Sequence, residues 1–233
     1  MKHITIATYN IRHGADVRQD WSLLAKNIHQ SGADIVGIQE VDMGTRRVHG
    51  IDSLAGLAKA TGFAHTLFIP AMDYDGGQYG TAILSRLPVF ASEYHPLESA
   101  DYEPRAFGCI RVTTEDGRAL CFLNTHLTNA VTEQQDIQLR QIADWIETQI
   151  DRDTTTILTG DFNTEDFAAF SPLTDRGFAL VNNADHTYKT FRNPPVAIDN
   201  IVYRTALIPV AHGMIDSDYS DHNLLWCRFA FVD

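Results

Sequence analysis

The sequence of 233 residues predicts a single α/β domain spanning residues 1–233. Two segments, 4–40 and 119–163, share the order strand, helix, strand, and no linker rich in proline and serine separates them. In a parallel strand–helix–strand unit, both strands end at the same edge of their sheet. Polar residues follow the strands of both units, so each unit brings a set of polar side chains to one edge.

Nine segments predict strands, because they are rich in β-branched and aromatic residues and are bounded by turn-forming residues. They are residues 4–9, 34–39, 79–84, 107–113, 119–124, 155–159, 198–203, 208–211 and 224–231.

Two helices are predicted from the residues at their ends. Asp20 can cap the first helix, and Gly32 can end it. Asp52 or Ser53 opens the second, and Gly62 lies beyond its last residue. Apolar residues at helical spacing occupy one face of each segment, which indicates packing against a core.

Thr132 and Gln135 have the spacing of a capping box, which predicts that a third helix begins there. The apolar residues that follow recur at the spacing of a helix face packed on a core. They are Leu139, Ile142, Ala143, Ile146 and Ile150.

The charge of the chain is strongly negative. Asp plus Glu number 30 and Lys plus Arg number 18, which gives a formal net charge of −12. This balance excludes a positive field over the whole surface, the usual means of binding a phosphate backbone. It therefore disfavours a nuclease that tracks along a polymer, whereas an acidic site for a divalent cation would account for part of the excess.

The three cysteines, Cys109, Cys121 and Cys227, lie far apart in apolar runs. Their odd number and their spacing favour buried thiols in a reducing compartment over disulfides or a zinc site. The sequence has no apolar stretch of the roughly 18 residues that a membrane span requires, and its first residues do not form a signal peptide. We expect a monomeric, cytoplasmic protein, with secretion left open for a chain whose leader has been removed.

Eight polar side chains flank the apolar strands at positions that can share one edge. Some follow a strand, and others precede one. The beginning of an antiparallel strand lies where its neighbours end, so both groups can meet. They are Asn10, Glu40, His126, Asp161, Asn163, Asp199, Asp221 and His222. Taken singly, each also has a structural explanation, such as a turn, a cap or a buried hydrogen bond.

Seven motifs in order resemble the endonuclease/exonuclease/phosphatase superfamily of metal-dependent phosphohydrolases. They are "TYNIRHG" (8–14), "DIVGIQEVD" (34–42), "YGTAILSR" (79–86), "LNTHL" (123–127), "TGDFN" (159–163), "IDNIVY" (198–203) and "SDH" (220–222). The resemblance covers nearly the whole chain. It implies a four-layer α/β sandwich, in which two mixed β-sheets pack face to face with helices outside.

The resemblance also implies a cation site. Glu40 is expected to bind the catalytic cation, with Asn10 and Asp221 as further oxygen ligands. Ligands that are all oxygens favour Mg²⁺, with Mn²⁺ or Ca²⁺ as alternatives. A zinc site formed by His126 and His222 is the competing interpretation.

The same resemblance implies the catalytic roles. His222 is a general base or a donor to a phosphate oxygen, and Asp199 accepts the other N–H of its ring. Asp161 activates or orients the attacking water. Asn163 donates to the phosphoryl oxygen, and His126 stabilises the same charge or protonates the leaving group.

Tyr79, Arg105 and Arg46 are candidates for binding the substrate, because a guanidinium pairs with phosphate through two hydrogen bonds. A tyrosine at a strand edge and surface salt bridges are the structural alternatives. Thr81 stands where many relatives carry Asn, and "VDMG" after Glu40 differs from the lysine-containing pattern of abasic-site endonucleases.

The sequence therefore predicts a metal-dependent hydrolase of a phosphodiester or phosphomonoester. The expected substrate is a phosphorylated small molecule or a lipid headgroup. The alternatives are a nuclease acting on DNA or RNA, which the net charge disfavours, and a non-catalytic binding protein on the same fold.

Overall fold

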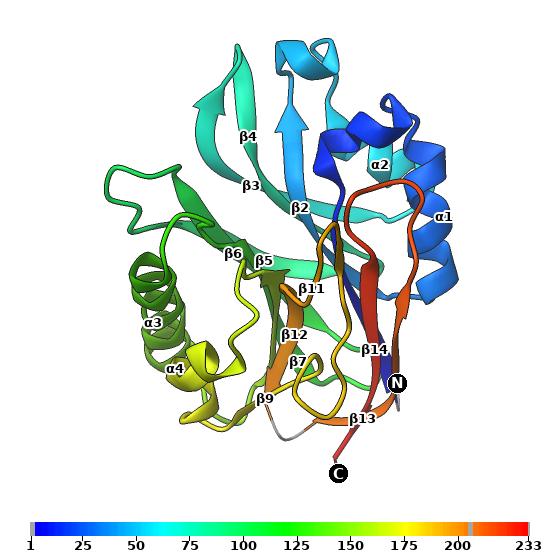
Figure 1. Cartoon of the computed structure of the whole chain (residues 1–233). Coiled ribbons are helices and arrows are strands. Elements are labelled where there is room, and N and C mark those ends of the chain that lie inside the picture. Colours follow the sequence, from blue (N-terminus) through cyan, green and yellow to red (C-terminus); the bar gives the residue numbers. More distant parts are fainter. Residues whose placement is uncertain (1–2, 205–206, 233) are drawn as a thin grey trace.

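A computed structural model describes residues 3–204 and 207–232. Two six-stranded sheets pack face to face, and helices cover the outer face of each sheet (Figure 1). This is the four-layer α/β sandwich that the resemblance implied.

The first sheet has the strand order β13-β14-β1-β2-β4-β3. Its strands are β1 His3–Asn10, β2 Ile35–Met43, β3 His65–Tyr74, β4 Gly77–Ser85, β13 Leu207–Ile215 and β14 Leu224–Phe231. Its helices are α1 Trp21–Ser31 and α2 Ser53–Thr61, with the 3₁₀ turns η1 Arg12–Val17 and η2 Arg46–Val48.

The second sheet has the strand order β5-β6-β7-β8-β12-β9. Its strands are β5 Val89–Leu97, β6 Arg105–Thr113, β7 Ala119–His126, β8 Thr155–Asp161, β9 Phe178–Leu180 and β12 Asp199–Arg204. Its helices are α3 Thr132–Gln149 and α4 Ser171–Thr174, preceded by η3 Phe167–Phe170. A separate ribbon consists of β10 Phe191–Arg192 and β11 Pro195–Val196.

The two predicted strand–helix–strand units are confirmed. β1 pairs with β2 in parallel and β7 pairs with β8 in parallel, with α1 and α3 as the respective crossover helices. β14 runs antiparallel to β1, and β12 runs antiparallel to β8. The strand beginnings therefore lie at the edge where the parallel strands end, as the sequence predicted.

The predicted capping interactions are present in two of the three helices. The side chains of Asp20 and Asp52 accept backbone N–H groups at the starts of α1 and α2, and Gly32 and Gly62 end these helices in the left-handed conformation. The third helix begins at Thr132, as predicted, but the predicted capping box is absent, because Val131 is the N-cap and makes no side-chain capping hydrogen bond.

The Gln135 side chain of α3 has a different role from the predicted one. Its Nε2 donates to the carbonyl oxygens of Thr128 and Asn163, at 2.9 and 2.8 Å. The side chain thus ties the loop after β7 to the loop after β8, and it is not available to reach back to its own helix end.

The space between the sheets is filled by apolar side chains from both, among them Ile6, Phe122, Ile157 and Phe229. A second cluster lies beneath α1 and α2, and a third beneath α3 and α4. Cys109, Cys121 and Cys227 are buried free thiols, as predicted. Within residues 3–204 and 207–232, no helix combines the length and apolarity needed to cross a bilayer.

Replacing Phe122 with alanine should lower the free energy of unfolding by about 3–5 kcal/mol, because it leaves a cavity in a well-packed core. Phe122 is 0% exposed between the two sheets. Urea unfolding followed by circular dichroism measures the change. Phe90→Ala is the control, since Phe90 is 63% exposed. An equal loss in both variants would contradict the prediction.

A buried polar network joins the sheets just beneath the strand ends. Gln39 Nε2 donates to Thr8 Oγ1 at 2.9 Å and to Asn124 Oδ1 at 2.7 Å. Thr159 Oγ1 also donates to Asn124 Oδ1, at 3.0 Å. Since Gln39 precedes Glu40 in the chain, this network fixes the two halves of the polar edge relative to each other.

Candidate active site

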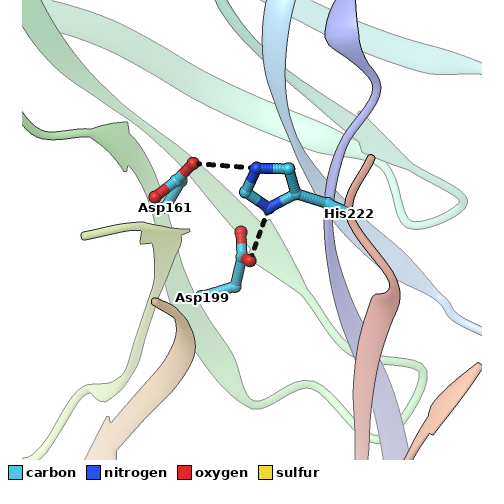
Figure 2. Close-up of side chains that lie close together, drawn as sticks. All are labelled: Asp161, Asp199 and His222. Atoms are coloured by element: carbon cyan, nitrogen blue, oxygen red, sulfur yellow. Dashed lines mark hydrogen bonds and ion pairs between the residues drawn. The ribbon is translucent and has the colours of Figure 1, made fainter. Parts of the chain in front are cut away.

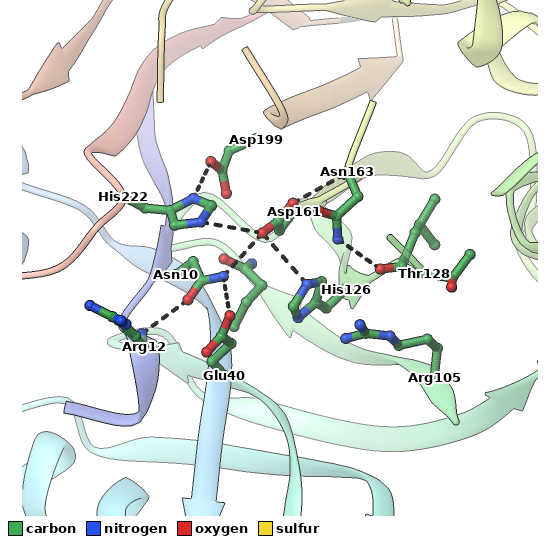
Figure 3. A network of polar contacts seen from close by, with 12 residues as sticks. Asn10, Arg12, Glu40, Arg105, His126, Thr128, Asp161, Asn163, Asp199 and His222 are labelled. Carbon is green, nitrogen blue, oxygen red and sulfur yellow. Dashed lines mark hydrogen bonds and ion pairs between the residues drawn. The ribbon is translucent and has the colours of Figure 1, made fainter. Parts of the chain in front are cut away.

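A cavity of about 570 Å³ opens at the shared edge of the two sheets. Its walls include Glu40, His126, Asp161, Asn163, Asp221 and His222. Asn10 and Asp199 lie directly behind this wall, 0% and 1% exposed. All eight polar residues singled out from the sequence therefore gather in one region. Figure 3 labels all of them except Asp221.

Strand pairing explains how three of these side chains meet. His126 is the last residue of β7, Asp161 is the last of β8, and Asp199 is the first of β12. The register places His126 opposite Asp161 and Asp161 opposite Asp199. Directly paired residues project from the same face of a sheet, so one row across three strands carries an imidazole and two carboxylates.

A bulge in β2 brings Glu40 into the cavity. The pairing of β2 with β4 shifts between Ile38 and Val41, and Glu40 has a left-handed backbone with φ of 57°. A bulge of this kind redirects a side chain at the end of a strand. Glu40 Oε1 accepts a hydrogen bond from Asn10 Nδ2 at 3.0 Å, and Oε2 lies 3.6 Å from His13 Nδ1.

Glu40 is held in its ionised form. Burial alone would raise the pKa of its carboxyl group, but the adjacent His13 ring, the nearby His126 and His222 and the hydrogen bond from Asn10 lower this pKa to about 2. The carboxylate is therefore charged at neutral pH, as a ligand of a divalent cation needs to be.

Asp161 and Asn163 also form a local turn, which is the simplest structural explanation of their spacing in the sequence. The backbone N–H of Asn163 donates to Asp161 Oδ1 at 3.1 Å, and Asn163 adopts a left-handed φ of 53°. Asn163 Nδ2 donates to the Leu127 carbonyl oxygen at 2.9 Å. The turn and the polar site are thus the same structure, since the turn fixes both side chains at the cavity.

His222 and Asp199 form a tight pair next to Asp161 (Figure 2). His222 Nδ1 lies 2.8 Å from Asp199 Oδ2, and Nε2 lies 3.7 Å from Asp161 Oδ2. Burial opposes protonation of the ring, but the carboxylates of Asp199 and Asp161 raise the pKa of His222 to about 10. Burial and the Asp199 charge raise the pKa of Asp161 to about 7.

His126 lies on the other side of Asp161 from His222 (Figure 3). Its Nε2 is 3.5 Å from Asp161 Oδ2. Burial and the charge of Arg105 hold the pKa of His126 well below its ordinary value. The two histidines therefore differ in charge at neutral pH, with His222 protonated and His126 neutral.

The orientation of Asn10 differs from the predicted one. Its Nδ2 donates to Glu40 Oε1 and to Asp161 Oδ2, both at 3.0 Å. Its oxygen accepts the backbone N–H of Arg12 at 3.0 Å. Asn10 thus bridges two carboxylates as a donor, and its oxygen does not face the cavity in this orientation.

Of the three candidates for binding the substrate, Tyr79 and Arg105 line the cavity and Arg46 does not. Arg46 is 79% exposed and forms an ion pair with Asp75. Its neighbour Arg47 lines the cavity instead. The choice between adjacent arginines depends on the η2 turn, which the sequence did not predict.

Sequence reasoning also missed two contacts made by the "TYNIRHG" motif. Arg12 Nε lies 3.4 Å from Asp221 Oδ2, and His13 approaches Glu40. Arg12 and His13 have positive φ angles of 45° and 44°. The position of these basic residues two and three places after Asn10 was a signal that could have indicated their contacts with the acidic site.

The site offers two groups of ligands for a metal ion. Asp161, Asp199 and His222 are buried, with one ligand atom each within 4.8 Å of the others. Glu40 and Asp221 supply carboxylate oxygens at the cavity wall. The arrangement thus combines a possible metal site, a histidine–carboxylate pair and a neutral imidazole, which together suit the transfer of protons at a charged substrate.

Comparisons with known proteins agree with this geometry. A sequence model of the Endonuclease/Exonuclease/phosphatase family matches residues 7–222. The fold is similar to that of an endonuclease/exonuclease/phosphatase from Beutenbergia cavernae, with 21% identity and a TM-score of 0.84 over 100% of this chain and 72% of that chain.

Two further solved structures share the fold. The human Nocturnin catalytic domain with bound sulfate anion is 19% identical, with a TM-score of 0.78 over 99% of this chain and 95% of that chain. A mannosyl-6-phosphatase from Bacteroides thetaiotaomicron is 17% identical, with a TM-score of 0.72 over 98% of this chain and 100% of that chain. Since the family model spans most of the sequence, the chain belongs to the endonuclease/exonuclease/phosphatase family of phosphoester hydrolases.

Proposed function

We propose that the protein is a Mg²⁺-dependent hydrolase of a phosphodiester or phosphomonoester in a small-molecule or lipid-linked substrate. The observation that carries the proposal is the meeting of Glu40, Asp161 and His222 at one cavity. A phosphate ester resists attack because its anionic oxygens repel nucleophiles, so its hydrolysis requires both neutralisation of charge and movement of protons. These residues supply groups for both.

Glu40 and Asp221 suit Mg²⁺, which prefers oxygen ligands. Both carboxylates line the cavity, and the low pKa of Glu40 keeps it charged. Asn10 adds a neutral oxygen when its amide is turned over, and Mn²⁺ or Ca²⁺ would use the same ligands. When bound, the cation supplies charge neutralisation at the phosphoryl oxygens.

Asp161 orients the attacking water and accepts its proton. A pKa of about 7 suits a group that exchanges a proton near neutral pH. Hydrogen bonds from Asn10 Nδ2 and from the Asn163 backbone hold the two oxygens of this carboxylate in place.

His222 donates a hydrogen bond from Nε2 to a phosphoryl oxygen. Its pKa of about 10 favours this role over that of a general base, because the ring is already protonated at neutral pH. Asp199 fixes the ring through Nδ1. His126 is neutral, so it stabilises the developing charge as a hydrogen-bond donor. Asn163 Nδ2 donates one N–H to the Leu127 carbonyl oxygen, and its second N–H is the donor to the phosphoryl oxygen.

A nuclease of the same family is the alternative. It would need a basic face built from arginines near the site. However, Arg12, Arg46, Arg47 and Arg105 each form an ion pair with a nearby carboxylate. Their charges are therefore compensated, which favours a small substrate, and the phosphatase name of one structural neighbour supports the same choice.

Removal of divalent cations should abolish turnover, because the ester's negative charge would then be left without its counter-ion. The purified protein is assayed with an aryl phosphodiester and an aryl phosphomonoester, with EDTA and after addition of Mg²⁺, Mn²⁺ or Ca²⁺. We expect activity to disappear with EDTA and to return with Mg²⁺. Turnover that persists in EDTA, or is absent with every cation, would overturn the proposal.

A further inference from the structure

Arg47 is held rigidly at the wall of the cavity. Its Nε and Nη2 donate to the two oxygens of Asp42 at 2.6 and 2.7 Å. Asp42 is 0% exposed and also accepts a hydrogen bond from Thr45 Oγ1 at 2.5 Å. The backbone N–H of Arg47 donates to Asp75 Oδ2 at 2.8 Å. A long side chain that normally samples many rotamers is thereby fixed in one position.

Two tyrosines complete this part of the wall. The Arg47 Cζ lies 4.6 Å from the centre of the Tyr74 ring and 5.3 Å from that of Tyr79. The two rings are 6.2 Å apart. Burial, with the nearby charge of Glu40, raises the pKa of Tyr79 well above its ordinary value, so its phenol is a neutral hydrogen-bonding group. The Arg47 side chain is 30% exposed, so it remains accessible from the cavity.

The charges of this wall are paired internally. Arg47 is bound to Asp42, and Arg105 Nη2 lies 2.9 Å from Glu103 Oε1. Arg47, Glu103 and Arg105 all line the cavity. A second phosphate or a nucleic-acid backbone would require uncompensated cations here, and an acyl chain would require an apolar wall. Guanidinium donors beside carboxylate acceptors instead match hydroxyl groups, which donate and accept at once.

We propose that Arg47, with Tyr74 and Tyr79, forms a specificity site that binds the hydroxyl groups of a sugar or polyol in the alcohol part of the phosphoester. The proposal rests on the proposed phosphoesterase function and identifies its substrate class as phosphorylated polyhydroxy compounds. The tyrosine rings contribute apolar surface for the C–H groups of such a ligand, and the guanidinium contributes donors for its oxygens.

The test compares a hexose 6-phosphate with cyclohexylmethyl phosphate, which has a six-membered ring of similar size but lacks the hydroxyl groups and the ring oxygen. The wild-type protein should favour the hexose ester in kcat/KM. Arg47→Met should lower kcat/KM for the hexose ester by about 10- to 100-fold, the size expected for a lost hydrogen bond from a charged group. The value for cyclohexylmethyl phosphate should change by less than about threefold, since it forms no such hydrogen bond.

A second variant separates recognition from folding. Arg47→Met leaves the buried Asp42 without its ion pair, whereas the double variant R47M/D42N removes both charges and should retain the melting temperature. Arg47→Lys should recover part of the selectivity because it keeps a cationic donor. Arg140→Ala is the matched control, because Arg140 forms an exposed ion pair with Asp136 on α3.

The outcomes distinguish this inference from the proposed function. If both esters lose activity in parallel in the double variant, Arg47 acts only on the structure and the inference is wrong. It is also wrong if the wild-type protein shows no preference for the hydroxylated ester. In either case, Mg²⁺-dependent hydrolysis of an aryl phosphoester would leave the proposed function intact. Absence of all phosphoester hydrolysis would overturn both.

Discussion

Replacing His222 with asparagine is expected to lower kcat by about 10²- to 10⁴-fold, the range found for a positioned group that moves or shares a proton. Asparagine can keep a hydrogen bond to Asp199, but it cannot carry the positive charge of the imidazolium. The substitution therefore removes the group that faces Asp161 from Nε2 and would stabilise charge on the phosphoryl oxygen. Initial rates with an aryl phosphoester measure the loss.

The substitution Asp199→Asn should keep the His222 ring in position but remove the negative charge that favours its protonated form. The amide can still occupy the site 2.8 Å from Nδ1, but the anion that raises the pKa of His222 is gone. The pKa of His222, followed by NMR in the metal-free protein, should therefore fall from about 10 towards its ordinary value.

For the His222→Asn variant, a kcat within tenfold of wild type in a protein that remains folded would exclude a direct role for this ring.

The inner strands of both sheets were predictable from the sequence, whereas of the edge strands only part of β13 was. β1, β7 and β8 are almost fully buried, so their residues form apolar runs that are easily recognised. β3 and β5 lie at sheet edges and have mostly half-buried or exposed side chains. Their sequences are mixed, and their positions are determined by pairing with distant segments.

Two of the predicted strands ended too early in the sequence, just before residues of the candidate site. We expected strands to stop at Asn124 and Thr159, because polar residues follow them. In the structure β7 continues to His126 and β8 to Asp161, and these residues still pair across the sheet. Polar side chains at the end of a strand interrupt its apolar pattern but not its backbone hydrogen bonds.

The candidate site was predictable as a set of residues but not as an electrostatic arrangement. Spacing and motifs identified the groups that meet at the cavity. They could not indicate that His222 is protonated while His126 is neutral, because this difference arises from the Asp199 contact and from Arg105. The position of Arg47 likewise depends on Asp42 and on the β3–β4 hairpin, which only the fold brings together.

Replacing Glu40 with glutamine is expected to reduce kcat by about 10³-fold or more at a fixed Mg²⁺ concentration, because a bound cation contributes several kcal/mol to transition-state stabilisation. Glutamine is nearly isosteric and can still hydrogen-bond to Asn10. It lacks the charge that the low pKa of Glu40 preserves at neutral pH. The loss should therefore arise from weaker cation binding.

Thermal unfolding tests the same substitution without substrate. A ligand that binds only the folded state stabilises it by about 2.7 kcal/mol at 100 times its dissociation constant. Saturating Mg²⁺ should therefore raise the melting temperature of the wild-type protein, and Glu40→Gln should remove most of this shift. The control variant Glu133→Gln, on the exposed side of α3, should show the same Mg²⁺-induced rise in melting temperature as the wild type. If Mg²⁺ stabilises the Glu40→Gln protein as strongly as the wild type, then the cation is bound elsewhere, and Asp161, Asp199 and His222 become the next ligands to test.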